Sequence, residues 1–349
     1  MYIRAASNIS PQNTFGNQPF LQELVEYTGN KLTCIEPDYK SLIDPKLIRR
    51  MSRIIKMGVA TGMDCLQQAG IEAPDAIVTG TAYGCLEDTN TFLSKLVLQN
   101  EEALAPTAFI QSTHNTISAQ IALLLQCHRY NNTFVNGGAS FENALLDAMM
   151  LLNEGDADTV LAGGIDEITP TSHAILSRMG LYHWPTTSNL NLLDNPEKET
   201  MAGEGSAFFL LSNKASGNDL AKIDAISCFY KPVGLSEIEQ RINDFLSAQN
   251  IIINDIDAII NGKNGDVIND RIYKQLEQSL FANKQTINYK HLCGEYPTSS
   301  AFALWLAANA ISNGSFPSAI STTDTPLKRV LIYNHYQNIH HSLILLSAC

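Results

Sequence analysis

An internal repeat is the sequence feature that most constrains the fold of this chain. The segment DAIVTG at 75–80 returns as DAIING at 257–262. The segment TISA at 116–119 returns as TSSA at 298–301, with the same offset. A shared offset over two separate segments favours a duplicated chain, with two similar halves related by a pseudo-two-fold axis.

Short apolar runs alternate with amphipathic stretches, which indicates an α/β protein. Several runs are apolar without alternation, as in strands covered on both faces. We expect strands at 75–80, 133–137, 159–164, 207–212, 222–227, 257–262, 329–333 and 342–347. We expect helices at about 46–69, 88–99, 116–126, 139–153, 235–248 and 299–312. Together with the repeat, this pattern predicts an N-terminal half over 1–213 and a C-terminal half over 214–349, in one compact unit.

Charge and cysteine content exclude several functions. The formal net charge of −12 argues against nucleic-acid binding, which needs a basic surface. The 7 cysteines form no CxxC pair or Cys/His cluster, so we expect no metal site. Most of them lie in apolar runs, which favours a reduced, cytoplasmic protein. The N-terminus has no signal-peptide core, and the longest apolar stretch, 301–311, is too short to span a bilayer.

Four segments, in this order and spacing, resemble the β-ketoacyl synthases and thiolases. The longest is NTFVNGGASFENALLDAMMLLNEGDADTVLAGGIDE at 132–167, which resembles the strand, nucleophile turn, buried helix and following strand of that family. MAGEGSAFFLL at 201–211 resembles its GEG hairpin, and NGKNGDVIND at 261–270 its HGTGT…ND loop with one extra residue. KHLCGE at 290–295, followed by PTSSA, resembles KxxxGHxxGAAG. The resemblance implies a thiolase-like, duplicated five-layered αβαβα fold.

The residues that carry the chemistry of that family are missing. The family's cysteine lies at the N-terminus of a buried helix, which favours the thiolate. At that position this chain has Gly138, which cannot form an acyl enzyme. Asn261 and Glu295 replace the two active-site histidines, and Lys290, which matches the family lysine, could pair with Glu295. The segment YNHYQNIHHS at 333–342 replaces the glycine-rich loop, so we expect no condensing activity.

The resemblance also implies an interface. The family dimerises through the strand before the nucleophile, here 133–136 with Phe134 and Asn136. The turn at 109–115, with Phe109, Thr113 and His114, would reach the partner's acyl tunnel. The surrounding PTAFIQSTHNT at 106–116 resembles short synthase-like proteins of aryl-polyene and flexirubin pathways.

A basic stripe suggests a further contact. Arg49, Arg53 and Lys56 would share one helical face. Such a stripe attracts an acidic acyl carrier protein, although a solvated helix face explains it equally well.

These features predict a non-catalytic subunit of chain-length-factor type, without cofactor, that pairs with an active β-ketoacyl synthase and an acyl carrier protein. Two alternatives stay open. One is an acyltransferase or hydrolase that uses Asn261, Glu295 or a displaced cysteine such as Cys85 or Cys293. The other is a homodimeric acyl-binding protein. His335, His340 and His341 have no accompanying carboxylate motif, so we expect structural roles for them.

Overall fold

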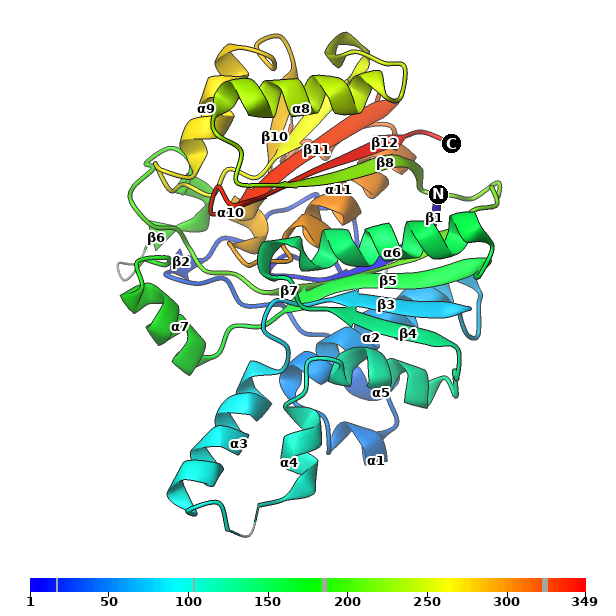
Figure 1. Cartoon of the computed structure of the whole chain (residues 1–349), viewed down its shortest axis with the longest axis vertical. Helices are drawn as coiled ribbons and strands as arrows, with labels where there is room; N and C mark the ends of the chain where they lie inside the picture. The colour runs from blue at the N-terminus through cyan, green and yellow to red at the C-terminus, as the bar shows by residue number, and fades with distance from the viewer. Residues whose placement is uncertain (17, 103, 184–186, 322–325) are drawn as a thin grey trace.

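The strands of the computed structural model join into one mixed sheet (Figure 1). The structure describes residues 1–16, 18–102, 104–183, 187–321 and 326–349. The ten-stranded sheet has the order β10-β9-β11-β12-β8-β1-β7-β5-β3-β4. Its strands are β1 (Tyr2–Ile9), β3 (Ala76–Gly80), β4 (Tyr130–Phe134), β5 (Thr159–Asp166), β7 (Gly205–Ser212), β8 (Ala221–Tyr230), β9 (Ala258–Asn261), β10 (Gln285–Asn288), β11 (Arg329–Tyr336) and β12 (His340–Ser347). A separate pair joins β2 (Thr28–Gly29) to β6 (Thr187–Ser188).

The sheet consists of two five-stranded parts with the same connectivity. They meet at β1 and β8, which pair over only two residues of β1, Tyr2 and Ile3. In one part β7 is antiparallel to β1 and β5, and β5, β3 and β4 are parallel. In the other, β12 is antiparallel to β8 and β11, and β11, β9 and β10 are parallel. The first repeat match therefore falls on equivalent strands, β3 and β9.

The second repeat match is a coincidence. TISA opens α5 (Thr116–Leu124), which lies between β3 and β4, whereas TSSA leads into α11 (Ser300–Asn313), which lies between β10 and β11. The topological counterpart of α11 is α6 (Ser140–Glu154), which follows β4. Because β7 ends at Ser212 and β8 begins at Ala221, we still propose a division of the halves near residue 213.

Helices complete the five layers that the resemblance implies. α6 and α11 lie between the two parts of the sheet (Figure 1). α2 (Arg53–Ala69) and α5 cover the outer face of the N-terminal part, and α8 (Leu235–Ser247) and α9 (Asp270–Gln278) cover that of the C-terminal part. The apolar residues of α11 form a buried helix, which ends where Gly314 adopts φ +80°. The largest core cluster takes side chains from both parts of the sheet and from both middle helices.

Some elements differ from the expected pattern. β1, β10, α9 and α7 (Pro170–Arg178) were not expected. β1 was not predicted because its buried residues include polar Ser7 and Asn8, which interrupt the apolar run that would indicate a strand. The stretch expected as one helix over 46–69 is two, because the extended backbone of Ser52 separates α1 (Pro45–Ile48) from α2. No helix among the described residues is long and apolar enough to cross a membrane.

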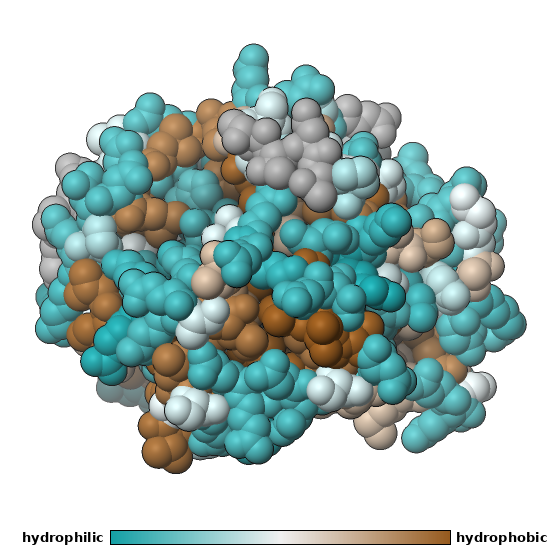
Figure 2. All heavy atoms as spheres, turned by 90° about the horizontal axis from the view of Figure 1, so that it is seen from above, coloured by the Kyte–Doolittle hydropathy of each residue, from teal (hydrophilic) through white to brown (hydrophobic). Residues whose placement is uncertain are grey.

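The two outer faces differ in character. Seen from the side of α8 and α9, the surface is mostly hydrophilic, with hydrophobic atoms showing near its centre (Figure 2). At the opposite end, α3 (Leu86–Leu98) and α4 (Pro106–Gln111) project beyond the layer of α2 and α5 (Figure 1). Neither of these two helices has a buried residue.

The shared middle layer predicts that both halves unfold together. Phe302 of α11 is fully buried and packs against Tyr289 and Trp305. Phe302→Ala should lower the free energy of unfolding by about 3–5 kcal/mol. Val233→Ala, at a site that is 97% exposed, should change it by less than about 0.5 kcal/mol. Chemical unfolding followed by circular dichroism should give a single transition for both variants. Two separated transitions would contradict a shared core.

Candidate functional site

Gly138, the residue expected at the nucleophile position, lies in the turn Gly137–Ala139 that leads from β4 into α6. Gly137 adopts φ +57°, which glycine tolerates, so the tight turn is kept. Ser140 closes the turn, since its Oγ donates to the Gly137 carbonyl and accepts from the Asn136 N–H, each at 2.8 Å. The turn thus keeps its shape without a reactive side chain.

Tyr336 occupies the space in front of Gly138. A Cβ atom on Gly138 would lie 2.3 Å from Cβ of Tyr336 and 2.7 Å from its Cγ, so the site has no room for any side chain. Tyr336 is the last residue of β11 and is 9% exposed. Its position is set by the tight turn to β12, in which Gln337 and Asn338 both have positive φ. The segment that replaces the glycine-rich loop is therefore a β-hairpin that closes the site.

Lys290 and Glu295 form a buried ion pair. Lys290 Nζ lies 2.8 Å and 3.1 Å from the two carboxylate oxygens, and both residues are at most 6% exposed. Lys290 Nζ also donates to the His335 carbonyl at 3.4 Å, next to Tyr336. The Glu295 backbone is held by Met201, whose carbonyl accepts from its N–H at 2.9 Å. Removing either charge would leave the other buried and unpaired, at a cost of about 3–5 kcal/mol.

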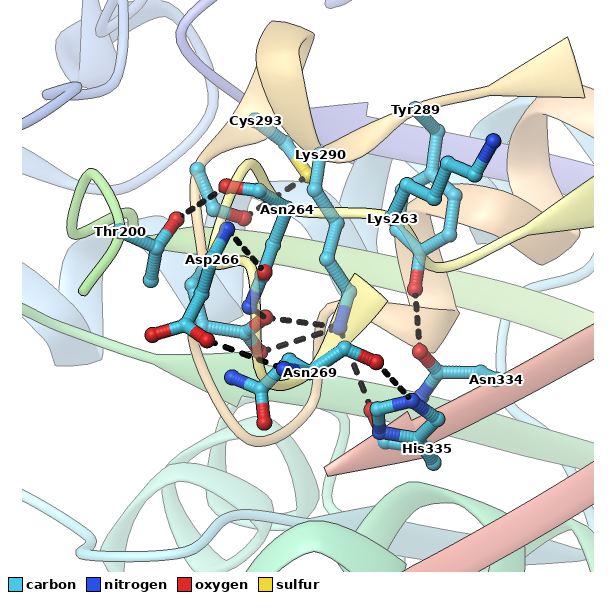
Figure 3. A network of polar contacts seen from close by, with 12 residues as sticks. Thr200, Lys263, Asn264, Asp266, Asn269, Tyr289, Lys290, Cys293, Asn334 and His335 are labelled. Carbon is cyan, nitrogen blue, oxygen red and sulfur yellow. Dashed lines mark hydrogen bonds and ion pairs between the residues drawn. The ribbon is translucent and has the colours of Figure 1, made fainter. Parts of the chain in front are cut away.

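Asn264, rather than Asn261, reaches this ion pair. Asn264 Nδ2 donates to Glu295 Oε2 at 2.6 Å, and its carbonyl accepts from Thr200 (Figure 3). Asn261 is also buried, but its Nδ2 donates to Glu277 Oε1 on α9 at 3.0 Å. Asn261 and Glu295, the two residues expected in place of the family histidines, thus do not share a partner. All oxygens of Glu295 are engaged, so no free general base is present at this point.

The other candidate groups are buried as well. Burial raises the pKa of the Cys85 and Cys293 thiols, so neither supplies a thiolate near neutral pH. Burial, with His341 and Lys290 nearby, lowers the pKa of His335, which stacks on Tyr273 at 4.5 Å. Within the described part of the chain, no group of three His, Cys, Asp or Glu side chains could hold a metal.

The strand that the resemblance assigns to the interface is an edge of the sheet. β4 is the last strand and pairs only with β3. It runs from 130 to 134, so Phe134 ends it and Asn136, expected in the strand, lies beyond it. An unpaired edge can accept another chain. Exposed apolar side chains surround it, namely Leu123, Tyr130 and Val135.

The expected turn at 109–115 is partly helical. Phe109 lies on α4, is 56% exposed and packs its ring 5.5 Å from that of Phe92. Thr113 and His114 do lie in the turn that follows. Thr113 Oγ1 donates to the Ile110 carbonyl at 2.9 Å, so its hydroxyl is directed into its own turn.

The three basic residues Arg49, Arg53 and Lys56 do not form the single helical face that the sequence predicts. Arg49 follows α1, while Arg53 and Lys56 lie on α2, so the three residues do not share one helix. Arg53 is committed elsewhere, because its guanidinium binds both oxygens of Glu204 at 2.6 and 2.7 Å. Glu204 has a fully buried side chain and needs this partner.

Sequence reasoning missed Tyr336 and Asn264. Polar Asn334 and His335 separate Tyr336 from the apolar run before it, so the pattern does not show that the strand continues to Tyr336. Asn264 lies in the 261–270 loop, and the extra residue of that loop hides which asparagine reaches Glu295. A contact between positions so far apart in sequence leaves no local signal.

The contact between Gly138 and Tyr336 predicts a strong coupling. Gly138→Ala should lower stability by about 1–3 kcal/mol, because Cβ overlaps the Tyr336 stem. In a Tyr336→Gly background, which removes both the ring and the Cβ that the new methyl group would meet, the same change should cost at least about 1 kcal/mol less. Gly217→Ala is the matched control, since its Cβ would meet nothing within 4 Å. Thermal or chemical unfolding of the four variants measures the cycle. Additive effects would mean that the two residues do not touch.

Comparison with known proteins identifies the family of the chain. The family model described as "Beta-ketoacyl synthase, N-terminal domain" matches residues 33–214. A comparison with curated protein sequences gives no match.

Solved structures with the same fold match the whole chain. "The ishigamide ketosynthase/chain length factor" matches with TM-score 0.78 and 16% identity, over 100% of this chain and 98% of that one. A β-ketoacyl synthase from Burkholderia phymatum STM815 matches with TM-score 0.79 and 14% identity, over 100% and 99%. A ketosynthase in complex with its chain length factor, from Xenorhabdus doucetiae, matches with TM-score 0.76 and 16% identity, over 100% and 98%. The fold is that of the thiolase-like ketosynthases, and by its family model the chain belongs to the β-ketoacyl synthase family.

Proposed function

We propose that this chain is a non-catalytic, ketosynthase-like subunit of chain-length-factor type that pairs with a cysteine-bearing β-ketoacyl synthase. The observation that carries the proposal is the filled position at Gly138, where Tyr336 leaves no room for a nucleophile. Without a nucleophile, the acyl-enzyme step of the family has no attachment point.

The buried ion pair of Lys290 and Glu295 is the second observation that supports a non-catalytic role. The buried pair of Lys290 and Glu295 replaces a site that must stabilise a developing enolate. A carboxylate there opposes negative charge, and its oxygens are already bound by Lys290 and Asn264. Both changes point to a fold that is kept for assembly rather than for condensation.

The surface around β4, α3 and α4 has the character of a protein–protein interface. β4 leaves one edge of the sheet unpaired, and exposed apolar side chains lie around it and on α3 and α4. Their exposed fractions include 70% for Leu123, 81% for Leu98 and 59% for Ile110. Clustered apolar exposure of this kind marks interfaces. In two of the similar structures, a ketosynthase is named together with a chain length factor.

The partner protein, the carrier and the pathway are parts of the same proposal. We infer a heterodimer with an active synthase, fed by an acyl carrier protein, in fatty-acid, polyketide or aryl-polyene-type biosynthesis in the cytoplasm. An acyl-carrier complex with a ketosynthase is among the similar structures. The 106–116 segment is the basis for the aryl-polyene and flexirubin expectation.

The two alternatives have less support. An acyltransferase or hydrolase would need a free base or thiolate, whereas Asn261, Glu295, Cys85 and Cys293 are buried and held. A homodimeric acyl-binding protein would use the same edge strand with a second copy. Co-expression with candidate synthases, followed by size-exclusion chromatography, separates the homodimer from the heterodimer.

The proposal predicts an interface at the end of β4. Val135→Asp should weaken the complex with a synthase at least tenfold, because it places a charge in a desolvated contact. Val233→Asp is the matched control, since Val233 is 97% exposed on the loop between β8 and α8. Titration by analytical ultracentrifugation measures both. Equal affinities for the two variants would place the interface elsewhere.

Product length tests the chain-length role. If α4 and the turn after it line a shared acyl tunnel, Phe109→Ala should shift products to longer chains at a similar condensation rate. Val233→Ala, on the exposed loop between β8 and α8, is the control. Product profiles are measured by mass spectrometry of the intact complex. Unchanged lengths for substitutions at Phe109, Thr113 and His114 in an intact complex would remove the length-control part of the proposal.

A further inference from the structure

A distant carboxylate holds the first turn of α3. Glu167, directly after β5, accepts a hydrogen bond at 3.1 Å from the backbone N–H of Glu87. Cys85, at the N-cap of α3, makes no side-chain cap bond of its own, so Glu167 fills this role from 80 residues away. At the other end of the hairpin, Gln111 on α4 donates to the Arg50 carbonyl. The two helices α3 and α4, together called the α3–α4 hairpin, are thus tied to the body at the first turn of α3 and the last residue of α4.

The hairpin is otherwise loosely packed. A cavity of about 270 Å³ separates α3 from α7 and is lined by Leu86, Leu93 and Ile175 among others. A polar cavity of about 510 Å³ lies on the Glu167 side, with Arg53 and Asn90 in its wall. With no buried residue in either helix and cavities beneath α3, the hairpin belongs to the low-stability part of the molecule.

Glu167 is an unusual anchor because it is only 5% exposed. Burial, together with the nearby charges of Glu87 and Glu204, raises its pKa to about 7, although the Glu87 N–H and Arg53 act in the opposite direction. The charged or titratable groups that face Glu167 are Glu36, Arg53, Glu87, Asp166, His173 and Glu204. Cys34 and Tyr182 also line these cavities and stay protonated, because burial raises their pKa.

We propose that Glu167 is a proton-sensitive anchor that positions the α3–α4 hairpin, clamping it when protonated and loosening it when ionised. A protonated Glu167 keeps its carbonyl as acceptor for the Glu87 N–H and carries no buried charge. An ionised Glu167 is stabilised when the hairpin lifts and water reaches the carboxylate.

The direction of the pH effect on the hairpin follows from the direction of the pKa shift of Glu167. The closed state holds its proton up to about pH 7, whereas an open, hydrated glutamate has an ordinary pKa of 4.5. The closed state therefore binds more protons between these values, and raising the pH favours opening. With full hydration on opening, the opening constant rises about tenfold from pH 6 to pH 8.

The hairpin carries the exposed apolar residues Leu93, Val97, Leu98, Phe109 and Ile110. If they contact a synthase, which rests on the proposed function above, the anchor makes assembly pH-dependent. A clamped hairpin presents a preorganised surface, so association is tighter at pH 6 than at pH 8.

Hydrogen–deuterium exchange on the full chain alone tests the anchor without any partner. After correction for intrinsic rates, peptides over α3 should lose about tenfold in protection from pH 6 to pH 8, relative to peptides over α11. Glu167→Gln keeps the acceptor without the charge, so it should be protected at both values. Glu102→Gln, an exposed glutamate in the loop after α3, should behave as wild type.

Two results would overturn the anchor. One is wild-type protection that does not fall with pH, and the other is a Glu167→Gln variant that keeps the wild-type pH profile. Because these measurements use the chain alone, failure to bind any synthase would reject the proposed function and leave the anchor standing.

Discussion

Both parts of the sheet bury a face against the same two helices, and the rest of the molecule depends on this shared layer. α6 and α11 cannot move without opening a core that takes side chains from both halves. The N-terminus of α6 is fixed by the same packing, and with it the turn at Gly138. A fold of this kind keeps its site geometry even when the chemistry is lost, because the geometry is supported by the core and not by the reacting residues.

The site is closed by mutually dependent contacts. The hairpin between β11 and β12 brings the Tyr336 stem against the backbone of Gly138, and the same strand offers the His335 carbonyl to Lys290. Lys290 in turn neutralises Glu295, which is also held by Asn264. A single substitution that restores one reacting group would meet a filled space or a bound carboxylate. The filled position at Gly138 and the bound carboxylate of Glu295 are therefore both part of the packing, and both would have to change before the chain could carry a nucleophile.

Much of the fold and part of the candidate site could be predicted from the sequence, because apolar runs and family-like segments are local signals. The layered fold, the glycine at the elbow and the pairing of Lys290 with Glu295 followed from them. The elements and contacts that the sequence did not predict have physical causes. β1 was hidden by its buried polar residues, and the helix expected over 46–69 breaks at an extended Ser52. The contact of Tyr336 with Gly138, and the anchoring of α3 by Glu167, join residues far apart in the chain and leave no local pattern.

The central claim is that this chain performs no covalent acyl chemistry of its own. Intact-protein mass spectrometry after incubation with acyl- and malonyl-carrier thioesters tests it most directly, with a cysteine-bearing synthase as the positive control. The account predicts no added acyl mass on this chain, while the synthase is acylated under the same conditions. A stoichiometric acyl adduct, mapped for instance to Cys293 or to the 132–145 peptide, would contradict it.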